Sequence, residues 1–307
     1  MNDNSIDLTC DLFGMKLKNP VLTASGTFGV GKDFQDFYDI NVLGGIVTKT
    51  ITMNKRDGNK PPRICETRSG IINSIGIQNP GAEKFIKENK EWFSQIKTKL
   101  IISVSGNTEE EYAEICALLK EKLEFDAVEL NVSCPNIKKG GVSFGEDPDS
   151  VERIVRQVKK RTGVYVITKL SPWTHLVKKV AQSAESAGSN ALAATNTIPA
   201  ISVDVKTFKS RIGNVTGGLS GPAIKPVSQK IFYDIVSAVQ IPVIGIGGIE
   251  TAEDALEYII LGAAAVEIGS ANMYNPFASK EILDGIEKYL KENNYKSLIE
   301  VKGKFSG

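Results

Sequence analysis

The segment N-V-S-C-P-N, residues 131–136, carries the residue type best suited to acid–base or nucleophilic chemistry in this chain. Pro135 biases Cys134 toward an extended conformation, where a strand is predicted to end. A thiol has an ordinary pKa of about 8.5, so it can act as a general base or as a nucleophile. We therefore predict that Cys134 is catalytic, whereas Cys10, Cys65 and Cys116 are interpreted as structural.

Two lysines, Lys49 and Lys169, each end an apolar run, in T-K-T and T-K-L. Burying an ammonium group is costly unless it meets an anion, so both are candidates for binding a ligand. If the ligand is a flavin, such a lysine would stabilise the reduced ring at its N1–C2=O edge. Two alternatives stay open: a lysine paired with a carboxylate, and a Schiff-base lysine like that of class I aldolases.

Asparagines and glycines add two further signals. Asparagine offers both a donor and an acceptor, so several together suit a flat heterocycle, although any single one can be a turn residue. The asparagines at or near predicted strand ends are Asn73, Asn79, Asn131, Asn136 and Asn196. I-G-G and I-G-S, ending at Gly248 and Ser270, are glycine turns whose backbone N–H groups can approach a phosphate, unless they are plain turns.

Eight short apolar runs precede these polar tips. Nearly continuous hydrophobicity is typical of parallel strands buried on both faces. The runs are 19–26, 44–50, 100–106, 127–133, 164–172, 191–197, 242–248 and 264–271. Amphipathic stretches that begin at Thr108, Asp147 and Thr251 predict helices between some of them.

This pattern favours an α/β fold, a (β/α)₈ TIM barrel, over a doubly wound sheet. We expect a single domain spanning residues 1–307. The long gaps 51–80 and 198–221 are predicted to form excursions over the C-terminal mouth of the barrel, where active sites of such barrels lie.

The bulk composition excludes several classes of function. The 307 residues include 37 Lys and Arg against 36 Asp and Glu, which predicts neither a nucleic-acid nor a membrane-surface partner. The N-terminus has no signal-peptide pattern, and no uncharged apolar run reaches the roughly 18 residues of a membrane span. Four scattered cysteines and one histidine, His175, indicate reduced thiols in a cytoplasmic protein and argue against a metal site.

The ordered motifs resemble the catalytic subunit of class 1 dihydroorotate dehydrogenases over essentially the whole chain. The motifs are L-K-N-P-V-L-T-A-S-G-T-F-G, T-K-T, G-I-I-N-S-I-G-I-Q-N-P-G, E-L-N-V-S-C-P-N, T-K-L-S-P, N-T, G-G-L-S-G-P-A-I-K-P, G-I-G-G-I and G-S-A-N. The resemblance implies a barrel that binds FMN and oxidises (S)-dihydroorotate to orotate in pyrimidine biosynthesis. It also implies that Cys134 removes the C5 proton while the C6 hydride passes to the flavin.

The resemblance assigns further residues to two groups. The expected substrate-binding residues are Lys49, Asn73, Ser74, Ile75, Gly76, Ile77, Asn131, Asn136, Asn196 and Thr197. The expected flavin-binding residues are Ser25, Gly26, Lys49, Thr50, Ser103, Asn131, Lys169, Thr195, Gly221, Gly247, Gly248, Gly269 and Ser270. Ser103 stands where the family pattern leads us to expect asparagine, and Thr195 where it leads us to expect an apolar residue.

Within class 1, A-S-G-T-F-G and P-R-I-C-E-T resemble the NAD-linked type B. That type works with a second subunit carrying FAD and a [2Fe–2S] cluster, in a heterotetramer of two plus two around a homodimer core. Alternatives are the fumarate-linked type A, a dihydropyrimidine dehydrogenase, a Schiff-base aldolase, and a barrel that serves only as a binding subunit.

Overall fold

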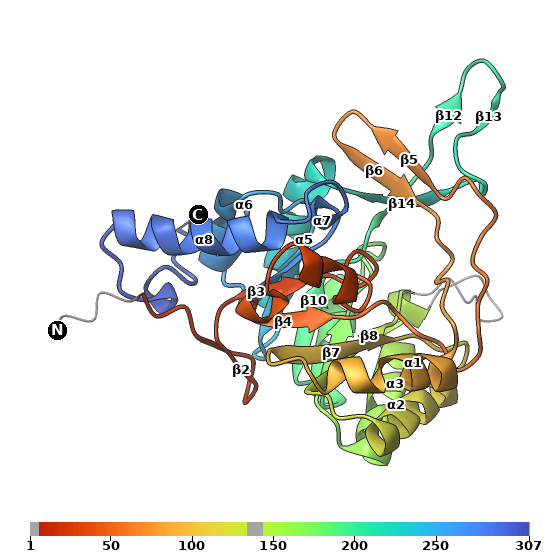
Figure 1. Ribbon diagram of the computed structural model, residues 1–307, viewed down its shortest axis with the longest axis horizontal. Coiled ribbons are helices and arrows are strands. Elements are labelled where there is room, and N and C mark those ends of the chain that lie inside the picture. The colour runs from red at the N-terminus through yellow and green to blue at the C-terminus, as the bar shows by residue number, and fades with distance from the viewer. Residues whose placement is uncertain (1–5, 134–143, 307) are drawn as a thin grey trace.

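The computed structural model describes residues 6–133 and 144–306. Its centre is a closed barrel of parallel strands that follow one another around the barrel in chain order (Figure 1). The barrel strands are β3 (Val21–Thr23), β4 (Gly45–Val47), β7 (Lys99–Val104), β8 (Ala127–Asn131), β9 (Val166–Lys169), β10 (Ala191–Ala194), β15 (Val243–Ile246) and β16 (Ala265–Ile268). These are the eight predicted runs, so the predicted (β/α)₈ barrel is confirmed.

Helices connect most strands and cover the outside of the barrel (Figure 1). They are α1 (Ala82–Phe93), α2 (Glu109–Lys122), α3 (Pro148–Thr162), α4 (Val177–Ser186), α5 (Lys225–Val236), α6 (Ala252–Ile260), α7 (Ala271–Tyr274) and α8 (Ala278–Glu292). The predicted N-caps are confirmed, because the side chains of Thr108, Asp147 and Thr251 each accept a backbone N–H of the first turn. Short 3-10 helices are η1 (Lys32–Asp36), η2 (Ile40–Val42), η3 (Phe144–Glu146), η4 (Pro222–Ile224) and η5 (Leu298–Glu300).

The connection after β3 differs from the expected strand-then-helix pattern. It contains only η1 and η2, and Gly26, Gly29 and Gly31 in it all have positive φ angles. An α-helix requires negative φ throughout, so these glycines exclude one from residues 26–31, and the connection forms only short 3-10 helices after them. Among the helices of the described ranges, none is both long enough and apolar enough to cross a bilayer.

Two separate hydrophobic cores fix the barrel. One lies between the strands and the surrounding helices, and the other fills the barrel interior with side chains such as Leu22, Ile101 and Ile244. The hairpin of β1 (Cys10–Asp11) and β2 (Lys16–Leu17) contributes Leu12, Met15 and Leu17 to this interior core. Because the hairpin packs at one end of the interior, the polar strand ends at the other end are left for a ligand.

The two long excursions form one sheet. Strands β5 (Ile64–Thr67) and β6 (Gly70–Asn73) from the first pair with β14 (Gly217–Ser220) and β11 (Ile198–Ala200) from the second, in the order β11-β14-β6-β5 (Figure 1). A small hairpin, β12 (Val203–Asp204) and β13 (Lys209–Ser210), extends beyond it. The sequence predicts the two excursions but not their pairing with each other.

Candidate active site

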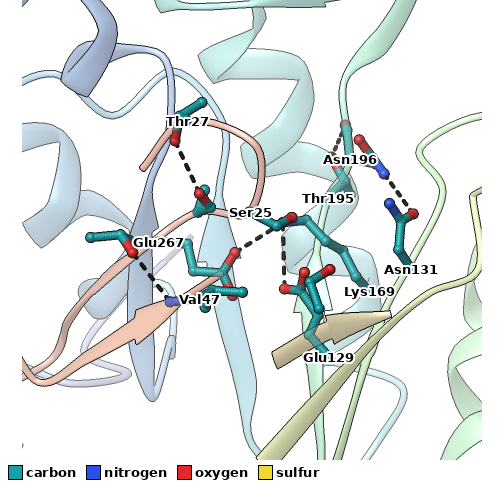
Figure 2. Close-up of polar contacts among 12 residues, drawn as sticks. Ser25, Thr27, Val47, Glu129, Asn131, Lys169, Thr195, Asn196 and Glu267 are labelled. Atoms are coloured by element: carbon teal, nitrogen blue, oxygen red, sulfur yellow. Dashed lines mark hydrogen bonds and ion pairs between the residues drawn. The ribbon is translucent and has the colours of Figure 1, made fainter. Parts of the chain in front are cut away.

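Polar side chains from four strands meet at the C-terminal end of the barrel. The hydroxyls of Ser103 and Thr50 lie 2.9 Å apart, and Asn131 Nδ2 lies 3.5 Å from Thr50 Oγ1. Asn196 Nδ2 donates to Asn131 Oδ1 at 3.2 Å, and these two amides face one another in Figure 2. The tips of β4, β7, β8 and β10 are thereby linked into one polar row, which brings together four predicted residues that lie far apart in the sequence.

The backbone on both sides of this row is fixed. Tyr112, fully buried on α2, donates its hydroxyl to the carbonyl oxygen of Asn131 at 2.8 Å. The backbone N–H of Thr197 donates to Asn196 Oδ1 at 2.8 Å, and Thr195 Oγ1 donates to the Asn196 carbonyl oxygen at 3.2 Å. Both asparagine side chains are therefore oriented before any ligand binds.

Lys169 lies at the centre of a buried ionic cluster inside the barrel. Its Nζ is 3.0 Å from Glu267 Oε2, 3.4 Å from Glu129 Oε2 and 3.2 Å from Ser25 Oγ (Figure 2). Burial opposes the charge of Lys169, but the two carboxylates outweigh it and raise the pKa of this lysine. The carboxylate-paired alternative therefore applies to Lys169, although its hydrogen bond to Ser25 still places it among the predicted ligand residues.

Lys49 has different surroundings. It is half-buried at the tip of β4, and burial lowers the pKa of its ammonium group. Across the part of the chain that the structure describes, no carboxylate lies within ion-pair distance of its Nζ. A half-buried ammonium group of this kind is suited to an anionic ligand.

The segment Asn73–Ile77 lies at the end of β6. Asn73 Nδ2 donates to the Gly218 carbonyl at 3.2 Å, which ties this segment to β14. Asn59 holds the next residues, because its amide donates to Ser74 Oγ at 2.8 Å and its backbone N–H donates to the Ile75 carbonyl at 3.1 Å. Gly76 and Ile77 both have positive φ angles, of 73° and 51°, so the chain turns sharply here.

Asn79 has the structural role that was the alternative for each asparagine. Its Oδ1 accepts the backbone N–H groups of Thr52 and Gly81, at 3.2 and 2.9 Å. Its Nδ2 donates to the Thr52 hydroxyl and to the Ile77 carbonyl, both at 2.8 Å. With 3% of its surface exposed, it organises the loop from within.

The predicted glycine turns follow β15 and β16, which are neighbours in the barrel. Gly247 and Gly248 have φ angles of 123° and 70°, and a Cβ on either would lie within 2.6 Å of an atom of Ser228 or Lys225 on α5. The glycines therefore let the turn pack closely against the start of α5. By contrast, a Cβ at Gly269 would have only the Ala24 side chain within 4 Å, at 3.7 Å, so its backbone is open to a ligand.

Comparisons with known proteins decide the family. The sequence profile of the family described as Dihydroorotate dehydrogenase matches residues 7–290. A dihydroorotate dehydrogenase B (NAD(+)) catalytic subunit from Petrotoga mobilis is 45% identical over 97% of this chain and 99% of its own. Two proteins of the same name, from Desulforamulus reducens and Caldicellulosiruptor saccharolyticus, are also similar. Each is 44% identical over 97% of this chain, and the matched region spans 98% of the first protein's length and 99% of the second's.

The chain belongs to the dihydroorotate dehydrogenase family. The resemblance expected from the sequence motifs is therefore confirmed, including its similarity to type B. The roles assigned to single residues stay predictions. Two of them, Cys134 and Asn136, lie outside the residues that the structure describes.

Several residues that contact the candidate site residues are not predicted by the sequence patterns. Glu129 and Glu267 are fully buried in β8 and β16, and they surround Lys169. Their signal was available, because a glutamate within an otherwise apolar barrel strand needs a cationic partner. Tyr112 and Asn59 gave no such signal, since their contacts join segments that are distant in the sequence.

Proposed function

We propose that this chain oxidises (S)-dihydroorotate to orotate with bound FMN, in pyrimidine biosynthesis. Family membership over 97% of the chain supports this proposal, and the row of Thr50, Asn131 and Asn196 at the barrel mouth is the observation that carries it. The row offers amide donors and acceptors next to a lysine, which suits both a flavin ring and a dihydropyrimidine ring.

The residues present fit FMN. Lys169 Nζ and Ser25 Oγ would bind the N1–C2=O edge of the flavin ring, since Lys169 ends β9, Ser25 follows β3, and the two side chains are hydrogen-bonded at 3.2 Å. The turns at Gly248 and Gly269 lie at the strand ends where barrels of this type hold phosphate groups. When bound, FMN supplies the acceptor for the hydride that leaves C6 of the substrate.

The chain's own residues orient the substrate and move its proton. Lys49 would bind the carboxylate of dihydroorotate, since its ammonium group is half-buried and without an ion pair among the described residues. Asn73, Asn131 and Asn196 would bind the ring amides. Cys134 Sγ would accept the C5 proton, so that loss of this proton and of the C6 hydride leaves the C5=C6 double bond of orotate.

The electrons would leave through a partner subunit. Relatives of this chain carry the name catalytic subunit, which supports the existence of a second subunit, and the name NAD(+) supports the acceptor. We infer that this partner carries FAD and a [2Fe–2S] cluster. The assembly would then be a heterotetramer of two plus two around a homodimer of this chain.

The test is the visible spectrum of the purified chain before and after anaerobic addition of dihydroorotate. We expect a yellow protein that is bleached by dihydroorotate and not by dihydrouracil, whose ring lacks the carboxylate. Bleaching by dihydrouracil alone would favour a dihydropyrimidine dehydrogenase. A colourless protein that takes up no FMN, and whose lysine Schiff base with a carbonyl substrate is trapped by borohydride, would favour a Schiff-base aldolase.

The role of Cys134 is tested with Cys134→Ala. This variant should bind orotate as the wild type does, yet its flavin should be reduced orders of magnitude more slowly because the proton acceptor is missing. Unchanged reduction would remove Cys134 from the mechanism. With the partner subunit present, NAD should be reduced; turnover with fumarate alone would favour type A.

A further inference from the structure

The cluster around Lys169 crosses the barrel interior. Glu129 and Lys169 lie on the paired strands β8 and β9, whereas Glu267 comes from β16, which pairs with neither of them. Both glutamates are fully buried and the lysine side chain is 5% exposed. Two carboxylates therefore share one ammonium group in an environment with little water to screen their charges (Figure 2).

Full ionisation would leave this cluster with a net negative charge, which a buried site disfavours. Apart from the Lys169 ammonium group, 3.4 Å from Glu129 Oε2, neither oxygen of Glu129 nor Oε1 of Glu267 has a hydrogen-bond partner among the described residues. One proton held between the carboxyls would supply the missing donor and would make the cluster neutral. Burial, followed by the charge of Glu129, raises the pKa of Glu267 to about 8, in agreement with a proton retained at neutral pH.

We propose that Glu129 and Glu267 are positioning residues that hold Lys169 against the flavin and, through one shared proton, set the flavin's reduction potential. This inference rests on the proposed function, because it requires a flavin beside Lys169. Reduced flavin carries negative charge at its N1–C2=O edge. A neutral cluster beside that edge permits reduction, and a cluster that has lost its proton to solvent opposes it.

The charges that act on the shared proton are few. Over the described part of the chain, Glu129 and Lys169 are the charged groups that shift the pKa of Glu267, and Glu129 and Glu267 are those that shift the pKa of Lys169. The neighbouring polar group, the Ser25 hydroxyl, does not change charge in this range. The pH dependence of the cluster therefore belongs to these three side chains.

The experiment is a redox titration of the FMN-loaded chain against a reference dye, at pH 7, 8 and 9. In both proteins the equilibrium constant for flavin reduction should fall as the pH rises. In the wild type, loss of the shared proton should make this fall steeper than in Glu267→Gln, by an additional factor of up to about ten per pH unit. For a two-electron couple this extra slope is about 30 mV per pH unit. At pH 7, Glu267→Gln should resemble the wild type, because both clusters are neutral.

The double variant Glu129→Gln/Glu267→Gln leaves Lys169 without a carboxylate. It should raise the equilibrium constant for reduction at least about tenfold at pH 7, because an uncompensated positive charge faces the reduced ring. Should the double variant fail to fold, the slope of Glu267→Gln still decides. Glu185→Gln is the control, since this glutamate lies in α4 and accepts backbone N–H groups of Gln240 and Ile241, away from Lys169.

Identical potentials and pH slopes in the wild type and Glu267→Gln would overturn the inference and leave the proposed function intact, provided that dihydroorotate bleaches both. A chain that binds no flavin would overturn both. A change in thermal stability without a change in potential would show that the glutamates are only structural, which also contradicts the inference.

Discussion

The hydroxyl of Tyr112 links helix α2 to the polar row, and its removal tests whether this hydrogen bond fixes the backbone of Asn131. The hydroxyl donates to the Asn131 carbonyl oxygen at 2.8 Å, and the tyrosine is fully buried. In Tyr112→Phe that carbonyl loses its buried donor, which costs about 1–3 kcal/mol of unfolding free energy. Each kcal/mol corresponds to a decrease in Tm of about 2–4 °C for a domain of roughly this size.

The same substitution should also weaken ligand binding, because Asn131 then loses part of the contact that fixes its backbone. We expect the dissociation constant of orotate, followed by the change in flavin absorbance, to rise by up to about tenfold, which is 1.4 kcal/mol. Both measurements use the FMN-loaded chain, with thermal and urea unfolding giving the change in stability.

Tyr233→Phe is the matched control. Tyr233 is 43% exposed, its ring packs against Phe305, and its hydroxyl has no hydrogen bond recorded within residues 6–133 and 144–306. It should therefore lose almost no stability and bind orotate normally. If Tyr112→Phe behaved like this control in both assays, the argument that Tyr112 fixes Asn131 would be wrong.

Three further predictions concern the buried cluster and the excursion sheet. Burial and the charge of Glu129 raise the pKa of Glu267 from 4.5 to about 8, so the folded apoprotein keeps a proton that the unfolded chain releases. The unfolding free energy of the wild type should therefore fall between pH 5 and 8 more steeply than that of Glu267→Gln. Equal slopes of unfolding free energy against pH, measured by urea titration, would contradict this. Asn59→Ala removes the hydrogen-bond donor to Ser74 and should raise the KM for dihydroorotate about tenfold with kcat nearly unchanged. The control Asn293→Ala, at the exposed C-terminal end of α8, should change neither KM nor kcat. In Gly218→Ala the new Cβ would lie 2.0 Å from Thr197 Oγ1, so Thr197 must move and the KM should rise at least about tenfold; an unchanged KM would show that Thr197 does not bind substrate.

Much of the fold could be predicted because its signals are local. A parallel strand buried on both faces is a short apolar run, and a helix start is a capping residue followed by an amphipathic stretch. Thr108, Asp147 and Thr251 were found in this way, and all three accept the expected backbone N–H groups. Candidate ligand residues such as Lys49, Asn131 and Lys169 were also found locally, since each lies at the end of an apolar run. Others, such as residues 74–77 and Gly221, were assigned through the family resemblance.

The tertiary structure decided what depends on contacts between distant segments. It paired Asn73 with Gly218, 145 residues apart, and so joined the two excursions into one sheet. It also placed Glu129 and Glu267 around Lys169. It showed that the Asn79 side chain binds backbone groups of its own loop.

The physical reason for this division is the range of the interactions. Hydrophobic periodicity and capping act between residues a few positions apart, so the sequence by itself determined the barrel strands, most helices and the polar strand ends. Pairing of strands, burial of charge and orientation of amides depend on which segments the closed barrel brings together. For that reason only the tertiary structure could show that Lys169 shares its charge with two glutamates.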